Sequence, residues 1–261
     1  MKSSWVTVAA CSLLIATAAH AQRAPAPAAP PRSAREAAPV DFTGYWVSPI
    51  MEDWRWRMVT PLKGDAASIP VNAAARAVID AWDPAADEAA GDACKAYGAP
   101  ALLRVPGRLR IRWLDDDTLE ISADAGEQTR LLRFNASPEE GGAPSRQGHT
   151  RAGWSFQTAR PGPAGVPLGM APGRAAPSRT LEATTTQLLP GYLRKNGIPY
   201  SGETTVQEFF DRFTEPDGTE WFTVTTIVTD PVYLGVPFVT TTDFRKERDG
   251  ARWDPRPCSV R

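Results

Sequence analysis

The sequence predicts a mainly β protein that folds as one antiparallel barrel or sandwich of about nine short strands. From residue 108 onward, apolar and polar residues alternate in most segments, which is the period of a half-buried strand. Turn sequences rich in Asp, Pro and Gly separate these segments at short intervals. The helical patterns are two, both short and both in one early connection. Many short strands joined mostly by tight turns are typical of a closed barrel or a sandwich.

The first 21 residues predict a Sec signal peptide. Lys2 supplies the positive start, Trp5–Ala19 the apolar segment, and an A-x-A motif that ends at Ala21 the cleavage site. Cys11 offers an alternative, a lipoprotein cleavage site, but much of the apolar segment follows this cysteine instead of preceding it. We therefore expect cleavage after Ala21 and a periplasmic or secreted protein.

The rest of the chain divides into a tether and one domain. Residues 22–40 are rich in Pro and Ala and have too few apolar side chains to pack, so we interpret them as a disordered tether. Residues 41–261 then form a single domain. Loss of Lys2 leaves 28 of the 29 Lys and Arg residues against 30 Asp and Glu, with no basic stripe for nucleic acid. No later apolar run reaches the length of a membrane span, and the sequence carries no signal for an oligomeric state.

Few residues remain for metal or nucleophile chemistry after cleavage. The mature chain keeps two cysteines, Cys94 and Cys258, and one histidine, His149. In an oxidising compartment we expect the cysteines to form a disulfide, with two unpaired thiols as the alternative. These residues are too few for a zinc site, and no Gly-rich phosphate motif follows a strand. We therefore expect neither a metal nor a cofactor.

The domain is expected to open with a strand pair and two helices. Phe42–Val59 reads as two strands, because Trp54, Trp56 and Met58 alternate with Arg55, Arg57 and Val59. Asn72 then caps a short helix that ends at Trp82, and Asp83 with Pro84 caps a second that runs toward Cys94.

Eight more segments of strand character account for the remaining chain. Asp115–Asp117 reads as a solvated turn between a strand at Arg108–Trp113 and a return strand through Leu119 and Ile121; a calcium site is the alternative. Two insertions rich in Gly, Pro and Ala, residues 135–147 and 159–178, are expected to be mobile loops. The expected strands are Arg108–Trp113, a return strand through Leu119 and Ile121, Gln128–Phe134, Thr150–Phe156, Arg179–Gln187, Glu203–Phe213, Thr219–Val228 and Pro237–Lys246.

Several blocks of the chain resemble a group of secreted lipocalin-like proteins of soil bacteria. They are FTGYWV and EDWRWRMVTPLKGD near the start, LPGYLRKNGIPYS at 189–201, Glu208-x-Phe-x-Arg212, and Asp230-Pro-x-Tyr-Leu234. The resemblance implies a lipocalin-like (calycin-type) barrel and brings no established activity with it. It also implies that a basic residue of the last strand, Arg245 or Lys246, packs over Trp46, which follows Gly44 on the first strand.

The hairpin from Glu203 to Val228 gives the sharpest candidate site. A turn at residues 215–219 with Gly in the left-handed position pairs Arg212 with Phe222, Phe210 with Val224 and Glu208 with Thr226. That register directs Glu208 and Arg212 to the inner, apolar face. A two-residue turn would instead direct Asp211 inward. An inward charge is destabilised by desolvation unless it has a partner. Glu208 is therefore either a cavity residue or part of a structural ion pair, with Arg212, Arg55 or Arg57 as the candidate partner.

Three functions are compatible with this pattern. The leading one is a barrel that binds a small, largely apolar or amphipathic molecule in its cavity. The alternative is a cofactor-free isomerase, hydratase or lyase with Glu208 as acid/base, and the third is a sugar-binding module that uses exposed tryptophans. An inward carboxylate without a cation would favour the enzyme, whereas Glu208 tied to an arginine would favour the binder. The candidate ligand-binding residues are Trp54, Arg55, Trp56, Arg57, Tyr192, Lys195, Tyr200, Phe210 and Arg212.

Overall fold

The computed structural model describes residues 32–137, 141–155 and 179–260, and residues Arg32–Arg261 fall in one compact unit. None of the helices in the described part is long and apolar enough to cross a membrane. The predicted loop at 159–178 lies outside the described residues. The elements in chain order are β1 (Gly44–Val47), α1 (Trp54–Arg57), α2 (Ala73–Ala81), α3 (Pro84–Ala89), the 3-10 helix η1 (Ala93–Tyr97), α4 (Ala99–Leu102), β2 (Arg108–Trp113), β3 (Thr118–Ala123), β4 (Gln128–Phe134), β5 (His149–Ser155), β6 (Thr180–Thr186), β7 (Gly191–Arg194), β8 (Ile198–Tyr200), β9 (Thr205–Thr214), β10 (Glu220–Thr229) and β11 (Phe238–Glu247).

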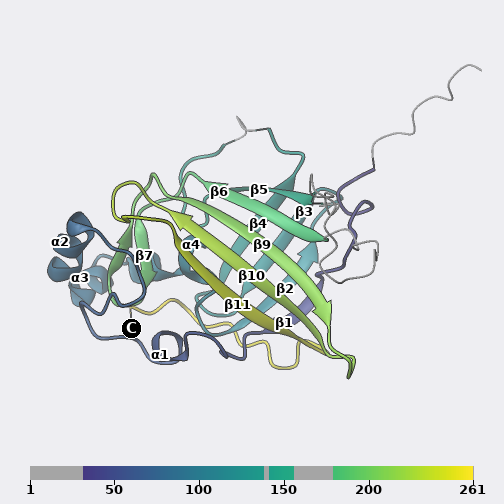
Figure 1. Cartoon of the computed structure of the whole chain (residues 1–261), viewed down its shortest axis with the longest axis horizontal. Helices are drawn as coiled ribbons and strands as arrows, with labels where there is room; N and C mark the ends of the chain where they lie inside the picture. Colours follow the sequence, from purple (N-terminus) through teal and green to yellow (C-terminus); the bar gives the residue numbers. More distant parts are fainter. Residues whose placement is uncertain (1–31, 138–140, 156–178, 261) are drawn as a thin grey trace, which may run out of the picture. The chain divides into compact units, whose positions relative to one another are not determined.

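Nine of these strands form a closed barrel, which confirms the predicted fold class. The order around the described barrel is β1-β11-β10-β9-β6-β5-β4-β3-β2 (Figure 1). The short first strand closes it, because β1 pairs with β2 on one side and with β11 on the other. Trp46 on β1 is fully buried, and the ammonium of Lys246 on β11 lies 5.4 Å from the centre of its ring. Lys246 thus takes the position expected of Arg245 or Lys246, and Arg245 is exposed.

One pair of barrel strands departs from the antiparallel pattern. β4 and β5 run parallel, with Leu132 opposite Thr150. An odd number of strands requires this, because directions that alternate around a closed ring of nine must coincide once. Parallel neighbours also need a connection of about a dozen residues or more, and residues 135–148 supply it.

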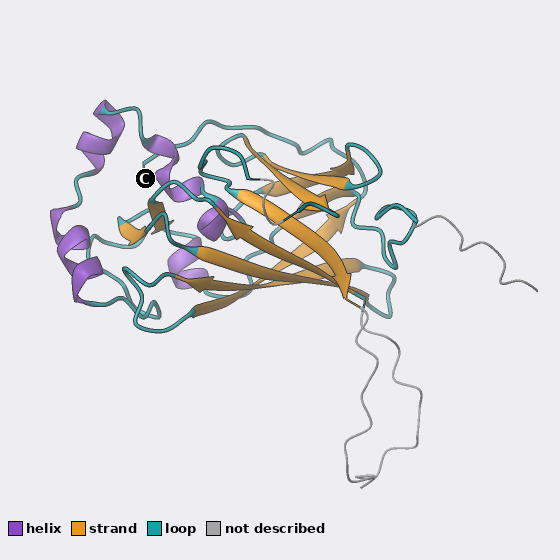
Figure 2. Cartoon of the chain, turned by 90° about the horizontal axis from the view of Figure 1, so that it is seen from above, coloured by secondary structure: helices purple, strands orange, loops and turns teal. Residues whose placement is uncertain are grey.

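The helices gather at one end of the barrel, as Figure 2 shows. The side chain of Asn72 accepts a hydrogen bond from Ala75 N at 3.0 Å, and that of Asp83 accepts one from Ala85 N at 3.0 Å. Both predicted caps are therefore confirmed, with Pro84 at the first position of α3. The second helix ends at Ala89 instead of running to Cys94, which lies in η1.

The segment around Trp54 is a helix, so the prediction of a second strand there was wrong. α1 is a single turn, entered through Asp53 in the left-handed conformation (φ 50°). The buried guanidinium of Arg57 fixes this turn, because it donates to Glu52, to Ser48 Oγ at 2.8 Å and to the Arg104 carbonyl at 3.0 Å. An alternation of six residues is too short to distinguish a strand from a helical turn that side-chain contacts hold in place.

The β9–β10 hairpin has the predicted register. Glu208 pairs with Thr226 and Phe210 with Val224, and Gly218 in the turn has φ 87°. The inner face of this hairpin is therefore the expected one, and Asp211 points outward.

Two further segments complete the structure. β7 and β8 form a separate two-stranded sheet around the Asn196-Gly197 turn, in contact with η1 and α2. Before the barrel, Ala34 is buried against the core, and its amide donates to Asp117 Oδ1 at 2.8 Å. The packed domain thus starts before residue 41, inside the predicted tether, because the turn at 115–117 accepts hydrogen bonds from the backbone amides of Ala34 and Arg35.

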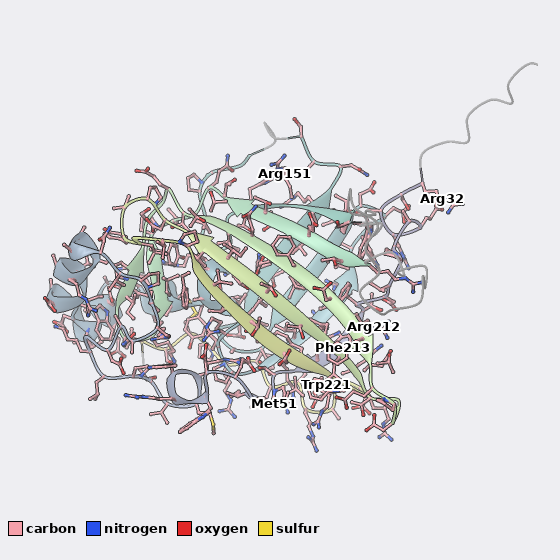
Figure 3. All side chains as sticks on the ribbon, viewed as in Figure 1. Arg32, Met51, Arg151, Arg212, Phe213 and Trp221 are labelled. Atoms are coloured by element: carbon pink, nitrogen blue, oxygen red, sulfur yellow. A yellow bond between two sulfur atoms is a disulfide. The ribbon has the colours of Figure 1, made fainter. Side chains whose placement is uncertain are left out.

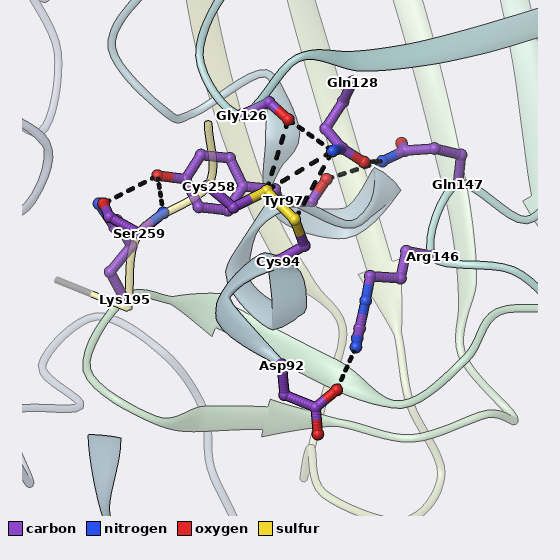
Figure 4. The surroundings of a disulfide bond; sticks show 10 residues. All are labelled: Asp92, Cys94, Tyr97, Gly126, Gln128, Arg146, Gln147, Lys195, Cys258 and Ser259. Carbon is purple, nitrogen blue, oxygen red and sulfur yellow. Dashed lines mark hydrogen bonds and ion pairs between the residues drawn. A yellow bond between two sulfur atoms is a disulfide. The ribbon is translucent and has the colours of Figure 1, made fainter. Parts of the chain in front are cut away.

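Cys94 and Cys258 form the predicted disulfide, with Cα atoms 5.1 Å apart across 164 residues of sequence. Figure 4 shows how it holds the C-terminal tail against η1: Tyr97 Oη accepts a hydrogen bond from Ser259 N at 3.2 Å, and Lys195 Nζ donates to Ser259 Oγ at 2.8 Å. The tail is thereby fixed along the helical end of the barrel.

Candidate functional site

Apolar side chains fill the barrel in two clusters. The first surrounds Trp46 and includes Phe210, Phe222 and Phe244, whose rings pack edge-on, tilted or stacked at 4.7 to 6.2 Å between ring centres. The second lies toward the helical end, where Val206, Val228 and Phe238 meet Ile79 of α2 and Tyr200 of β8. The interior is thus occupied largely by the protein's own side chains.

Along strands β9, β10 and β11, buried polar side chains lie between residues of the two clusters; together with three on β4, β5 and β6 we name them the polar belt. On β9, Glu208 lies between Val206 of one cluster and Phe210 of the other. The same alternation places a threonine between the clusters on β10 and two on β11. The members of the polar belt are Arg130, Thr150, Thr185, Glu208, Thr226, Thr240 and Thr242.

Glu208 and Arg130 form a buried bidentate ion pair in the polar belt. Arg130 Nη1 and Nη2 donate to the two oxygens of Glu208 at 2.8 and 2.5 Å, and both side chains are 0 % exposed. Nη2 also donates to Thr185 Oγ1 at 3.2 Å. Both carboxylate oxygens are therefore occupied, and this arrangement favours a structural role for Glu208.

None of the three arginines suggested as partners of Glu208 takes that role. Arg212 pairs with Glu220, Arg57 with Glu52, and Arg55 lies 4.0 Å from Asp65 at the surface. Figure 3 shows Arg212 at the end of the barrel opposite to the helices. The partner is Arg130 instead, because β4 faces β9 across the closed barrel.

A small pocket of about 50 Å³ lies outside the barrel, between α1, η1–α4 and β7; we name it the cationic pocket. Its charged lining residues are Arg57, Arg104, Arg194 and Lys195. Apolar side chains complete the wall, among them Val59, Val105 and Leu193, together with the face of Trp56. The pocket thus combines positive charge with an apolar surface.

An open groove of about 690 Å³ adjoins the cationic pocket, and we name it the tail groove. Met58, Val105 and Pro106 line one side, and Asp254, Arg256, Pro257 and Ser259 of the tail that the disulfide holds line the other; Arg108 and Asp124 also line the groove. Arg57, Thr60, Val105, Pro106 and Lys195 line both spaces, so the two are continuous.

The four cations of the pocket differ in their partners. Arg57 pairs with Glu52, and Arg104 Nη2 donates to Asp53 at 2.6 Å. Arg194 donates to the Ala67 carbonyl at 2.9 Å and to Ser68 Oγ at 2.8 Å, and among the described residues neither it nor Lys195 pairs with a carboxylate. Burial and the charge of Arg104 lower the pKa of Arg194 to about 10, although Asp53 and Asp65 act in the opposite direction.

The structure brings three of the nine candidate ligand-binding residues together. Trp56, Arg57 and Lys195 line the cationic pocket. Trp54 and Arg55 occupy the outer side of α1, where Trp54 is 64 % exposed.

The remaining four candidates lie elsewhere. Phe210 and Tyr200 are in the two apolar clusters, and Arg212 is near Glu220. Tyr192 donates to Asp87 Oδ2 at 2.8 Å, and burial together with that carboxylate raises the pKa of Tyr192 to about 12. We assign Tyr192 a structural role at the α3–β7 contact.

Two pocket residues were missed in the sequence. Arg194 is adjacent to the candidate Lys195 in the segment that leads into the Asn196-Gly197 turn, so a signal for it was present. Arg104 follows a short apolar helix and has no periodic signal of its own. Its role depends on α1 folding back over it.

No model of a protein family matches this chain, and no curated protein or solved structure matches it either.

Proposed function

We propose that this is an exported lipocalin-like protein that binds a small, largely apolar molecule in the tail groove, outside the barrel. The observation that carries the proposal is the continuity of the groove with a pocket walled by Trp56. Its volume of about 690 Å³ lies within the range of small-molecule sites, about 300–1,000 Å³. Apolar side chains and the polar belt occupy the barrel interior, so we propose a site at the barrel's helical end instead of in the expected cavity.

The disulfide supports both parts of this proposal. A bond between Cys94 and Cys258 fits an oxidising compartment. It also fixes the tail that forms one wall of the groove, which prepares the site before a ligand arrives and lowers the entropic cost of binding.

The other two functions have less support in the arrangement of side chains. An enzyme based on Glu208 stays a prediction, and it requires a path to a carboxylate that is 0 % exposed and held by Arg130. A sugar-binding surface requires several exposed tryptophans. In the described part of the chain, Trp54 is the one tryptophan among the exposed large apolar side chains.

A matched pair of substitutions tests the proposed site. Val105 lines both the groove and the pocket, so Val105→Trp should fill them. Val239→Trp makes the same change on the outer face of β11, where Val239 is 57 % exposed. With the neutral fluorescent probe N-phenyl-1-naphthylamine, we expect Val105→Trp to weaken binding about tenfold or more, or about 1.4 kcal/mol, and Val239→Trp to leave it unchanged. Equal binding by both variants would place the site elsewhere.

A further inference from the structure

We infer that the ligand is an amphipathic organic acid whose anionic group binds Arg194 beside Trp56. This inference rests on the proposed function, since it names the class of molecule that the groove takes. The acid group occupies the cationic pocket, and the apolar body extends into the tail groove.

The charge of the lining is the first observation. Arg57, Arg104, Arg194 and Lys195 line the cationic pocket, and its described lining contains no carboxylate. Two of these charges are already neutralised by Glu52 and Asp53. Arg194 and Lys195 leave an excess of positive charge, which an anion would compensate in a site of reduced solvent access.

Unused hydrogen-bond donors are the second observation. Trp56 Nε1 is buried and has no hydrogen-bond partner among the described residues. Arg194 is 7 % exposed and uses one N–H for Ala67 and one for Ser68. A guanidinium carries five N–H groups, so donors remain beyond these two. The Arg194 guanidinium carbon lies 5.1 Å from the centre of the Trp56 ring, so the two residues that carry these donors are direct neighbours.

The size of the pocket selects the part of the ligand that enters. A volume of about 50 Å³ holds only a few water-sized groups. It therefore suits an acid group and not a whole ligand. The residues shared with the tail groove connect this position to the larger space, and the apolar side chains of Met58, Val105 and Pro106 lie there for the body.

Arg194 is poised to respond to an anion. Its pKa is lowered because burial and the nearby Arg104 oppose its charge. A carboxylate or sulfonate placed against it would relieve this opposition, and charge-assisted hydrogen bonds to arginine are among the stronger ones in proteins.

Two probes with similar aromatic bodies test the inference. 8-Anilino-1-naphthalenesulfonate carries a sulfonate, and N-phenyl-1-naphthylamine lacks it. We expect the wild-type protein to bind the sulfonate at least about tenfold more tightly. Arg194→Met should abolish this preference and leave the affinity for the neutral probe unchanged. Arg151→Met is the matched control, since Arg151 is exposed on β5 (Figure 3), and it should keep the preference.

The outcomes separate the inference from the proposed function. If both probes bind equally well and Arg194→Met changes nothing, the inference is overturned and the groove stands. If neither probe binds, both are overturned together. Should Arg194→Met fail to fold, Lys195→Gln replaces it; because Lys195 also donates to Ser259 of the tail and lies over the ring of Tyr97, the affinity of this variant for the neutral probe reports any change in the tail wall. A smaller loss of the same preference is then expected, and an unchanged preference overturns the inference.

Discussion

At the scale of single residues, the partner of the buried Glu208 carboxylate determines whether it stabilises the fold or is available for chemistry. The Arg130–Glu208 pair is fully buried, and each partner depends on the other to offset its desolvation. The sequence predicted that Glu208 points inward but not which cation it meets. The hairpin turn sets the register of β9 against β10, whereas the meeting with Arg130 depends on closure of the whole barrel.

Removal of one partner of this pair should be costly. We expect Arg130→Met to lower the free energy of unfolding by about 3–5 kcal/mol, because it leaves Glu208 charged and unpaired. The double variant Arg130→Met/Glu208→Leu should recover part of that loss. Urea denaturation measures both.

Arg212→Met serves as the control for this measurement. Arg212 and its partner Glu220 are partly exposed, so the loss should be no more than about 1 kcal/mol. A similar loss for Arg130→Met and Arg212→Met would show that the buried pair contributes nothing special.

At the scale of elements, local signals were reliable where a turn or a cap fixed the geometry. The caps at Asn72 and Asp83 and the β9–β10 register follow from such signals. The strand predicted through Trp54 failed because contacts of Arg57 with Ser48 and with the Arg104 carbonyl hold α1 in place. Ser48 and Arg104 contact Arg57 only in the folded chain, so the pattern of apolar residues could not reveal these contacts. The cationic pocket could not be predicted for the same reason, since it depends on the position of α1.

The β7–β8 hairpin depends on its glycine in two ways. Gly197 has φ +82°, and a Cβ there would lie 2.3 Å from the ring of Trp82. Gly218 in the β9–β10 turn has φ +87° with no atom within 4 Å of its added Cβ. Gly218→Ala should therefore cost only the backbone strain of about 1–2 kcal/mol.

Gly197→Ala should cost clearly more than Gly218→Ala, because the clash with Trp82 adds to the same strain. Thermal unfolding of the two variants gives the comparison. Equal melting temperatures would show that Trp82 can move away from an added Cβ at residue 197 without a loss of stability.

For the whole molecule, the fold class was predictable because about nine alternating segments leave few architectures. The parallel pair β4–β5 was not foreseen, although an odd closed ring demands one such pair. A count of strands thus contained more information about topology than the pattern of any single strand.

The disulfide connects the fold to the proposed site. Cys94→Ser/Cys258→Ser should lower the free energy of unfolding by roughly 4–5 kcal/mol, according to the chain-entropy estimate for a long loop. It should also weaken binding of N-phenyl-1-naphthylamine, because the tail residues Asp254–Ser259 then lose their anchor. Calorimetry and fluorescence test the two effects separately. Unchanged probe affinity in the folded variant would show that the tail does not form a wall of the site.

The polar belt and the separate β7–β8 sheet have a consequence for local opening of the structure. On β9, β10 and β11 the polar belt lies between residues of the two clusters, and the Trp46 cluster continues past it to Tyr97 of η1 and Leu102 of α4. Cooperative units of a protein often coincide with supersecondary motifs. We expect amide hydrogens of β7 and β8, which form a separate two-stranded sheet, to exchange with deuterium before those of β10, which pairs with a strand on each side.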